Sequence, residues 1–429
     1  MNLKKWFDKR GPRFVIHRAS ALLTRYRISP TIAMARIEDS LAPLSRKGFS
    51  PTFFTPGIIV KRYPQFIQSL QAKGAEIAVH SYQHLDLNSM TLAKAKEQLD
   101  KAITTFNLLG INAHGFRCPY LSHSDELLES IDKGLFGYSS NKAVWIDVTQ
   151  LNTAGEQSII FNSLRRFYNP KLFTEYVSVP RSRANMIEIP VCVPDDLQLH
   201  DGLNLKSEGI SQAWIEMLNQ THQRGELFNL IFHPELGSVC KDSFEDLLQK
   251  ATLFRPFVWI ARLQDICEWW CEKSRFGVEV SPTSTKLIIN FACSPRATVV
   301  VRGIDNHIDA DAWVAPYWRL NSRIFETPAA PRPFVGIAPG VPEHIGLFLQ
   351  DQGYILDGSE QAMHCSVYID GTVLGKLTTE VQLIEYIEKS AGPLVRYWRW
   401  PNGAKSALSI TGDLDAITLI DYATRLSAH

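Results

Sequence analysis

One apolar run close to the end of the sequence constrains the fold more than any other stretch. Residues 406–412 read Ser-Ala-Leu-Ser-Ile-Thr-Gly, and Asp413 and Asp415 follow before a helical pattern begins. An apolar, β-branched run that leads into a glycine predicts a buried parallel strand. Because α/β proteins place their chemistry at the carboxyl ends of parallel strands, we expect these two carboxylates to stand at a functional edge.

Strand and helix patterns alternate over most of the chain before residue 276. The alternation predicts a parallel sheet, open or closed. The strand at 406–413 would then close a barrel whose other strands lie far upstream. Residues 142–183 follow no clear pattern. The expected upstream strands cover residues 50–55, 75–79, 112–116, 136–140, 186–193, 227–232 and 256–260.

The pattern changes near Phe276. Short runs separated by Pro, Gly, Asp and Asn follow, at 286–291, 297–302, 346–349 and 365–369. Such runs are typical of a small antiparallel β domain of the sandwich type. A helix at about 380–390 leads back to the α/β pattern. The expected domains are therefore an α/β barrel, residues 1–275 together with 394–429, and an inserted β domain, residues 276–393.

The charge balance weighs against a nucleic-acid partner. The chain has 45 Lys and Arg residues against 44 Asp and Glu residues, whereas nucleic-acid binding usually needs a basic face. One basic segment at the N-terminus is interpreted as a solvated helix, with contact to an anionic membrane surface as the alternative. Its basic side chains are Lys4, Lys5, Lys9, Arg10, Arg13, Arg18, Arg25 and Arg27.

Cysteine usage and the first residues predict a cytoplasmic protein. Residues 1–7 offer no uninterrupted apolar core, and no later run approaches the ~20 apolar residues of a spanning helix. Seven scattered cysteines, an odd number, predict reduced thiols rather than a disulfide framework. Cys267 and Cys271, beside two tryptophans, are interpreted as core residues rather than metal ligands.

Two histidines directly after an expected strand form the sharpest local motif. His80 and His84 are four residues apart, so they fall on one face of a turn or short helix. This spacing lets both imidazoles reach one divalent ion, although two surface histidines are the alternative. A carboxylate from Asp413 or Asp415 would complete a site with open positions for water and substrate, provided that the two strands are neighbours.

Other expected strands also end in chemically capable side chains. Arg117 could hold a carboxylate through a bidentate contact and keep it ionised, or it could pair with a helix acid. His233 ends a strongly apolar strand. In a parallel barrel all such strand ends share one rim. Unrelated surface residues would not follow that rule, so we expect Arg117 and His233 to meet His80 and Asp413.

These motifs resemble those of the polysaccharide deacetylases of carbohydrate esterase family four. Three segments are similar to the family's His-Ser/Thr-x-x-His, Arg-x-Pro-Tyr and late Leu-x-His motifs: His80-Ser81-Tyr82-Gln83-His84, Arg117-Cys118-Pro119-Tyr120 and Leu230-Ile231-Phe232-His233. Thr411-Gly412-Asp413-Leu414-Asp415 resembles the acidic motif of the family's first strand, with Asp-x-Asp where many members have adjacent aspartates.

The position of the acidic motif implies an unusual chain order. The resemblance covers roughly residues 29–275 and 395–429. It implies a distorted (β/α)7-type barrel that is circularly permuted, with its first strand supplied last. Such a rearrangement is physically easy because chain termini often lie close together.

The resemblance also implies a role for each site residue. Asp413 would be the general base, oriented by Arg117, and His233 the general acid. The backbone N–H of Tyr120 would help to stabilise the oxyanion. A metal polarises an amide carbonyl and acidifies water, the tetrahedral intermediate needs a donor, and the departing amine needs a proton. Three residues would bind the divalent metal, expected to be zinc: Asp415, His80 and His84.

Two assignments stay open at this level. The family's fourth motif, an Asp-rich stretch with Trp that tunes the acid histidine, has two candidates: Trp145 with Asp147, or Asp195 with Asp196. The Asp-x-Asp spacing also leaves open which aspartate binds the metal.

The sequence predicts a metal-dependent hydrolase that removes an N-acetyl group from a saccharide, by cleavage of a linear amide C–N bond. The expected partner is an acetylated saccharide or sugar conjugate. Two alternatives remain. One is a C–N hydrolase that acts on a non-sugar amide, with or without a metal. The other is a non-catalytic glycan-binding protein that uses the aromatic-rich β domain.

Overall fold

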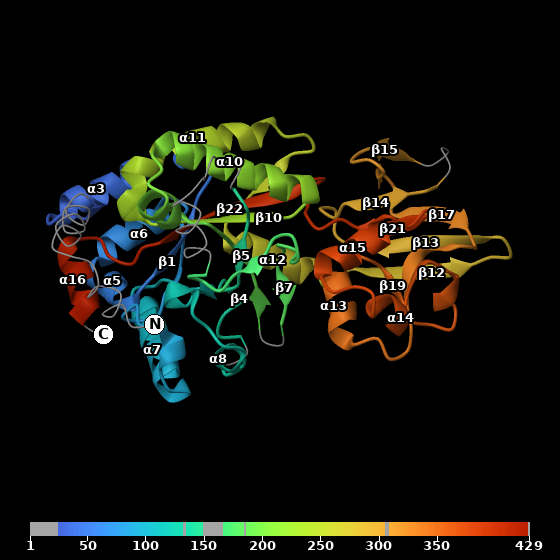
Figure 1. Ribbon diagram of the computed structural model, residues 1–429, viewed down its shortest axis with the longest axis horizontal. Helices are drawn as coiled ribbons and strands as arrows, with labels where there is room; N and C mark the ends of the chain where they lie inside the picture. Colours follow the sequence, from blue (N-terminus) through green and yellow to red (C-terminus); the bar gives the residue numbers. More distant parts are fainter. Residues whose placement is uncertain (1–24, 132–133, 149–165, 184–185, 305–308, 428–429) are drawn as a thin grey trace.

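The computed structural model describes residues 25–131, 134–148, 166–183, 186–304 and 309–427. Figure 1 shows an α/β body, in which helices surround a curled sheet, and beside it a second part that is built mainly of strands. The chain builds most of the body first, then the second part, and returns to the body in its last strand and helix.

A 12-stranded sheet forms the centre of the body. Its strand order is β6-β5-β9-β10-β22-β1-β2-β3-β4-β8-β7, and β11 also pairs with β22. The one antiparallel pair among these described strands joins β7 to β8. The strands are β1 (Thr52–Thr55), β2 (Glu76–Val79), β3 (Gly115–Phe116), β4 (Tyr138–Ser139), β5 (Ala143–Trp145), β6 (Lys171–Leu172), β7 (Arg181–Ser182), β8 (Ile187–Glu188), β9 (Val191–Val193), β10 (Leu227–Phe232), β11 (Val258–Ile260) and β22 (Ser406–Asp413).

Helices cover the outside of this sheet. In Figure 1, α10 and α11 lie side by side above it, and α5, α6 and α7 lie below. Trp214 of α10 stacks on Phe244 of α11 with ring centroids 5.2 Å apart, so the two helices share a continuous apolar contact. The helices are α3 (Pro30–Ser40), α4 (Ala42–Arg46), α5 (Gly57–Arg62), α6 (Pro64–Ala72), α7 (Leu92–Leu108), α8 (Asp125–Glu129), α10 (Ser207–Arg224), α11 (Gly237–Leu253), α12 (Leu263–Lys273) and α16 (Leu419–Ser427).

Strand β22 is the buried parallel strand that its sequence predicts. All of its residues are buried. It pairs in parallel with β10 along one edge, and with β11 and then β1 along the other. Gly412 is needed in this position. A Cβ there would lie 2.7 Å from the Phe53 ring and 3.1 Å from the Phe232 ring, which belong to the two neighbouring strands.

The expected strand at 186–193 is divided in two. Pro190 cannot donate a backbone hydrogen bond, and it separates β8 from β9. Tyr138 of β4 lies opposite Ile187 of β8, whereas Cys192 of β9 lies opposite Leu230 of β10. One interrupted segment therefore contacts both sides of the sheet, and this makes the sheet curl towards a barrel.

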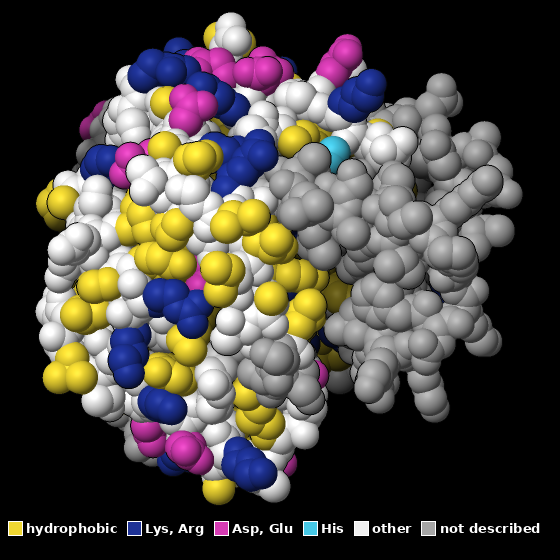
Figure 2. All heavy atoms as spheres, turned by 90° about the vertical axis from the view of Figure 1, so that its left-hand side faces the viewer, with side chains coloured by type: hydrophobic (Ala, Val, Ile, Leu, Met, Phe, Trp, Pro, Cys, Tyr) yellow, Lys and Arg dark blue, Asp and Glu magenta, His cyan; other side chains and the backbone are white. Residues whose placement is uncertain are grey.

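The N-terminal basic segment lies almost entirely outside the described residues, which begin at Arg25. The Arg25 side chain is 14% exposed and forms an ion pair with Glu235, so it does not offer the free positive charge that was expected of it. Arg27 forms a parallel bridge with Thr418. The side of the molecule that carries α3 and α16 mixes apolar side chains with Lys and Arg, as Figure 2 shows.

The second part differs in three respects from the expected antiparallel β domain. Two of its sheets are antiparallel, β12-β13-β17 and β15-β16-β14-β21, but β18 pairs in parallel with β19 and β20. The run at 346–349, expected as a strand, lies in helix α13, and parallel strands need such connecting helices. Strand β21 pairs with β14, so this part extends beyond the expected boundary at 393. Its elements are β12 (Gly277–Pro282), β13 (Lys286–Ala292), β14 (Val299–Arg302), β15 (Ala310–Ala312), β16 (Trp318–Leu320), β17 (Ile324–Pro328), β18 (Arg332–Ile337), α13 (Glu343–Asp351), β19 (Leu356–Asp357), β20 (Cys365–Ile369), α14 (Gly371–Leu374), α15 (Glu380–Glu388) and β21 (Leu394–Tyr397).

Two further facts concern the chain as described. None of the helices in the described ranges combines the length and the apolar character that crossing a bilayer requires. All seven cysteines are free thiols, and Cys267 is buried as expected of a core residue.

The packing around Gly412 yields a stability prediction. In Gly412→Ala the added methyl group would press on two buried rings of neighbouring strands. We expect a loss of about 1–3 kcal/mol in the free energy of unfolding, the usual effect of overpacking a core. Urea unfolding measures it. Gly358→Ala is the control, because a Cβ there meets nothing within 4 Å. Equal stability of the two variants would contradict this account of β22.

Candidate active site

Neighbouring strands bring the expected site residues to one edge of the sheet. Asp413 lies opposite Phe54 where β22 pairs with β1, and Phe232, just before His233, lies opposite Gly412. The backbone N–H of His80 donates to Thr55, and that of Arg117 donates to Val79. The carboxyl ends of β10, β22, β1, β2 and β3 therefore follow one another along one edge, which is the shared edge that the sequence predicted. The strand of Asp413 is not the direct neighbour of the strand before His80, because β1 lies between them, so the neighbour condition was wrong.

The His80–His84 segment is a tight turn rather than a short helix. Ser81 and His84 both have a φ of 58°. The first backbone N–H groups of α5 donate to the turn, Gly57 to Ser81 and Ile58 to Tyr82. The Ser81 hydroxyl accepts from the backbone N–H of His84 at 3.0 Å. These contacts hold the turn in a conformation in which both imidazoles face the end of β22.

Three side chains converge there. The His84 Nε2 atom lies 3.0 Å from Oδ1 of Asp415, and the His80 Nε2 atom lies 3.4 Å from the same oxygen. Ligand atoms of His80, His84 and Asp415 all lie within 4.8 Å of one another. The three side chains are at most 8% exposed. Asp415, not Asp413, is thus the aspartate that both histidines contact most closely.

The hydrogen bonds of this cluster leave two buried acceptor atoms without a donor among the described residues. The His80 Nδ1 atom lies 2.9 Å from the carbonyl oxygen of Arg117, so it carries the proton and donates. The Nε2 atom of a neutral His80 then presents a lone pair towards Asp415. Within the described part of the chain, neither this atom nor Oδ1 of Asp415 has a hydrogen-bond partner. Buried lone pairs that face one another need a positive charge between them.

Electrostatics favour metal binding by the same residues. Burial lowers the pKa of His84 to about 4, although Asp415 opposes this shift, so the imidazole is neutral at pH 7. Burial disfavours the charge of Asp415, but His84 and Arg425 outweigh it and hold the pKa of the carboxyl well below its usual range. Two imidazoles and one carboxylate are a ligand set that suits a divalent transition metal.

Asp413 is held by a buried arginine. Arg117 Nη1 donates to Oδ1 of Asp413 at 2.6 Å. The remaining guanidinium nitrogens donate to Ser140 and Thr411, and the group lies 4.0 Å above the Phe54 ring. Arg117 is fully buried. The contact uses one carboxylate oxygen, and it leaves Oδ2 of Asp413 directed towards His80, 3.7 Å from Nε2.

His233 is paired with Asp196, which decides between the two candidates for its partner. The His233 Nδ1 atom lies 2.8 Å from one Asp196 oxygen, and the His233 backbone N–H donates to the other at 2.8 Å. Burial opposes the imidazolium, but Asp196 outweighs it and raises the pKa of His233 to about 10. Trp145 belongs to the hydrophobic core and Asp147 lies at the surface, so this alternative pair is wrong.

Tyr120 also stands beside the cluster. Its ring and that of His84 meet edge to face, with centroids 4.9 Å apart. The Tyr120 backbone has a φ of 61° and a ψ of 15°, which is rare for a residue with a side chain. This conformation turns the peptide plane of the Arg117-Cys118-Pro119-Tyr120 motif sharply next to the candidate ligands.

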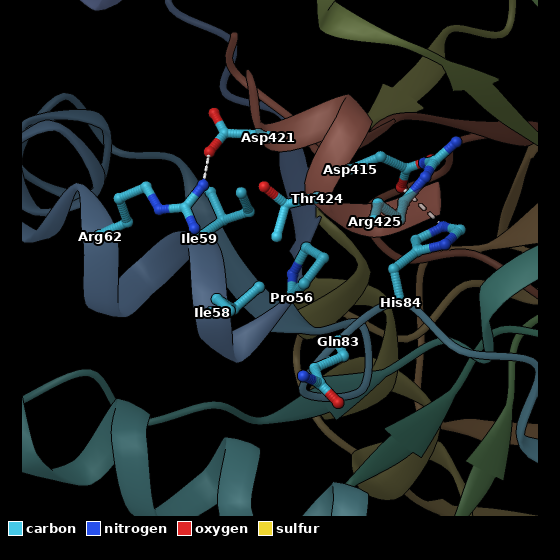
Figure 3. Close-up of a pocket in the computed structure, with 10 residues that line it drawn as sticks. All are labelled: Pro56, Ile58, Ile59, Arg62, Gln83, His84, Asp415, Asp421, Thr424 and Arg425. Carbon is cyan, nitrogen blue, oxygen red and sulfur yellow. Dashed lines mark hydrogen bonds and ion pairs between the residues drawn. The ribbon is translucent and has the colours of Figure 1, made fainter. Parts of the chain in front are cut away.

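One residue of the site was not expected from the sequence. Arg425 Nη1 donates to Oδ2 of Asp415 at 2.6 Å. Figure 3 shows His84, Asp415 and Arg425 directed towards one another at the wall of a pocket of about 30 Å³. Arg425 belongs to helix α16, and it stands in no motif that would have revealed it.

The His233–Asp196 pair yields a prediction on protonation. A raised folded-state pKa means that the imidazolium stabilises the fold below about pH 6.5, and that this stabilisation is lost as the pH rises through about 10. In Asp196→Asn the largest influence that opposes burial is gone, and only Glu235 and Asp195 still raise the pKa of His233, so its midpoint should fall below the wild-type value. Nuclear magnetic resonance of the histidine ring protons measures the midpoint, with the His233 signal assigned from a His233→Gln spectrum. A wild-type midpoint near 6.5 would contradict the pairing.

Comparison with known proteins agrees with this geometry. Residues 33–135 match a model of the polysaccharide deacetylase family, and this range contains His80, His84, Arg117 and Tyr120. A bifunctional xylanase/deacetylase of Pseudobutyrivibrio xylanivorans is 30% identical over 105 residues, which are 24% of this chain and 17% of that protein. A peptidoglycan deacetylase-like protein of Gibberella zeae is 30% identical over 91 residues, 21% of this chain and 27% of that protein.

The matches cover only part of each protein. The chain spans less than a third of the length of the two relatives. Among solved structures, the peptidoglycan deacetylase PdaC from Bacillus subtilis aligns with a TM-score of 0.34 and 15% identity over 56% of this chain and 87% of that one. A score of this size carries no argument by itself. Residues 33–135 are therefore similar in sequence to the polysaccharide deacetylase family.

Proposed function

We propose that this chain is a metal-dependent hydrolase that removes the N-acetyl group from an acetylated saccharide. The observation that carries the proposal is the convergence of His80, His84 and Asp415, whose ligand atoms lie within 4.8 Å of one another. Among the described residues, Nε2 of His80 and Oδ1 of Asp415 have no hydrogen-bond partner. Arg117 pairs with Asp413, and Asp196 pairs with His233, at the same edge of the sheet. The family match adds support from sequence.

The metal itself would be held by His80, His84 and Asp415, and zinc fits the two imidazoles and one carboxylate best. Bound there, such an ion supplies a Lewis acid that polarises an acetyl carbonyl and acidifies water. Because His84 is neutral and Asp415 ionised at pH 7, neither has to lose a proton before it binds a cation. The site is thus prepared for a metal at neutral pH.

Asp413 is proposed as the general base. Its Oδ2 atom is not engaged by Arg117, which contacts Oδ1. That oxygen can take a proton from water as the water oxygen attacks the acetyl carbon. Arg117 fixes the carboxylate in one orientation, because its other nitrogens are tied to Ser140 and Thr411. The role of Arg117 is therefore positioning.

His233 is proposed as the general acid. Asp196 binds Nδ1, so Nε2 is the nitrogen left to give a proton to the sugar amine as the C–N bond breaks. The products are acetate and a free amine. The raised pKa keeps the imidazole charged at neutral pH, which is the state a proton donor needs. Tyr120, by its resemblance to the family motif, would donate its backbone N–H to the oxyanion of the tetrahedral intermediate.

We also infer that the body is a circularly permuted seven-stranded barrel. Support comes from the unbroken row of pairings β9-β10-β22-β1-β2-β3-β4-β8. Its two ends, β8 and β9, are the halves of one chain segment, so the row counts seven strands when that segment is taken as one. The last strand of the chain thus occupies the place between β10 and β1. The parallel bridge between Arg27 and Thr418 brings the two ends of the described chain together.

The second part, from β12 to β21, is proposed to be a separate domain that takes no part in the chemistry. Strand β22 runs away from that part towards α16 (Figure 1), so the site lies at the far end of the strand. The pocket beside His84 and Asp415 is lined by residues of the body. The cytoplasmic location and the membrane contact of the basic segment stay predictions.

The metal prediction concerns His80→Ala. We expect purified wild-type protein to retain close to one zinc per chain, and the variant to lose most of it, because one of three protein ligands is gone. Elemental analysis after dialysis measures the content. His344→Ala removes an exposed histidine of α13 and serves as the control. Equal metal content in His80→Ala and wild type would contradict the assignment of the site.

The activity prediction concerns Asp413→Asn. Acetate release from an N-acetylated chitooligosaccharide or peptidoglycan fragment should fall by about 10²–10⁴-fold, the usual contribution of a positioned base. Zinc content should remain that of the wild type, because the metal ligand is Asp415. A zinc-loaded wild-type protein that released no acetate from any acetylated saccharide would refute the proposed reaction.

A further inference from the structure

Arg425 occupies a place that the proposed chemistry does not use. Its Nη1 atom donates to Oδ2 of Asp415 at 2.6 Å, while Oδ1 of the same carboxylate faces His84 and His80. One carboxylate is therefore shared between a guanidinium and the proposed metal site. The Arg425 side chain is 14% exposed, so water screens its charge only weakly.

The helix that carries Arg425 is held firmly at its start. Asp421, in the first turn of α16, accepts hydrogen bonds from the backbone and hydroxyl of Thr418 and from the Tyr63 hydroxyl. Arg62 forms an ion pair with the same carboxylate. Figure 3 shows Arg62 and Asp421 on one side of the pocket and Arg425 with Asp415 on the other.

The guanidinium itself is also packed. It lies 5.1 Å from the centroid of the Tyr422 ring, and that ring stacks at 4.9 Å on Tyr26. These contacts fix the position of the Arg425 guanidinium on Oδ2 of Asp415. A cation that binds to His84 and to Oδ1 of Asp415 would therefore lie close to this positive charge. Loss of a partner that supports a metal ligand usually costs about 10–100-fold in metal affinity. A cationic partner acts with the opposite sign, because its charge repels the dication.

We propose that Arg425 is a positioning residue that holds Asp415 in a one-oxygen presentation and, through its charge, weakens the binding of the metal. This inference rests on the metal site of the proposed function. The guanidinium of Arg425 partly neutralises the Asp415 carboxylate, and this reduces the attraction between the carboxylate and a divalent metal ion. Compared with two histidines and an unshared carboxylate, such a site would hold its metal less tightly and would leave the ion a stronger Lewis acid.

The experiment compares zinc dissociation constants in four full-length proteins by competition with a chromophoric chelator at pH 7. Arg425→Gln removes the charge, and Arg425→Lys keeps it. Arg62→Gln is the matched control, because Arg62 lines the same pocket and pairs with the same helix, but through Asp421 rather than a metal ligand. Urea unfolding of the metal-free proteins checks that each is folded, and Arg425→Met serves as a second uncharged variant if Arg425→Gln is not.

The inference predicts that the uncharged variant binds zinc about tenfold or more tightly than wild type, and that Arg425→Lys and Arg62→Gln stay within a few-fold of it. Unchanged or weaker zinc binding in the uncharged variant, with wild type binding normally, would overturn the inference and leave the proposed function in place. A wild-type protein that binds no zinc would overturn the metal site itself, and the inference with it.

Discussion

The parallel pairing of β22 with β10 on one side and β1 on the other is the constraint on which the rest of the site depends. Hydrogen bonds along both edges and a fully buried surface hold this strand, although it comes last in the chain. Its carboxyl end delivers Asp413 and Asp415 within reach of side chains that precede them by hundreds of residues. If the strand were shifted by one residue, its two faces would be exchanged and both carboxylates would leave the site.

The titratable side chains at this edge form two histidine–aspartate pairs, and the two histidines differ in protonation. His84 is buried beside Asp415 and stays neutral, whereas His233 is buried beside Asp196 and stays charged. The difference follows from the hydrogen bonds. Asp196 contacts His233 through both of its oxygens, and Asp415 divides its oxygens between His84 and Arg425. A histidine with an aspartate therefore forms two candidate metal ligands at His84 and Asp415, and a candidate proton donor at His233 and Asp196.

The sequence predicted the parts of this arrangement that depend on local patterns. The buried runs that end at Asp413 and His233 are strands, and the turn that carries His80 and His84 follows its strand directly. The apolar pattern of a parallel strand and the shared edge of such strands were sufficient for these. Pro190 is the one sequence signal for the break between β8 and β9, since proline cannot donate to a strand ladder.

Other features depend on side-chain directions that no spacing encodes. Asp195 and Asp196 are neighbours, yet Asp196 turns to His233 while Asp195 accepts from Tyr168 and Gln198. Arg425 reaches Asp415 only because α16 folds back over the end of β22, a tertiary contact without a sequence motif. In the second part, the short apolar run at 346–349 is compatible with either a strand or a helix. It is helical because it connects and covers strands of a parallel sheet.

Anomalous diffraction from crystals grown with zinc would test the central claim most directly. The account predicts one strong zinc peak at about 2.0–2.2 Å from Nε2 of His80, from a ring nitrogen of His84 and from Oδ1 of Asp415. A map without a peak at these three side chains, from crystals of a protein that releases acetate, would contradict it.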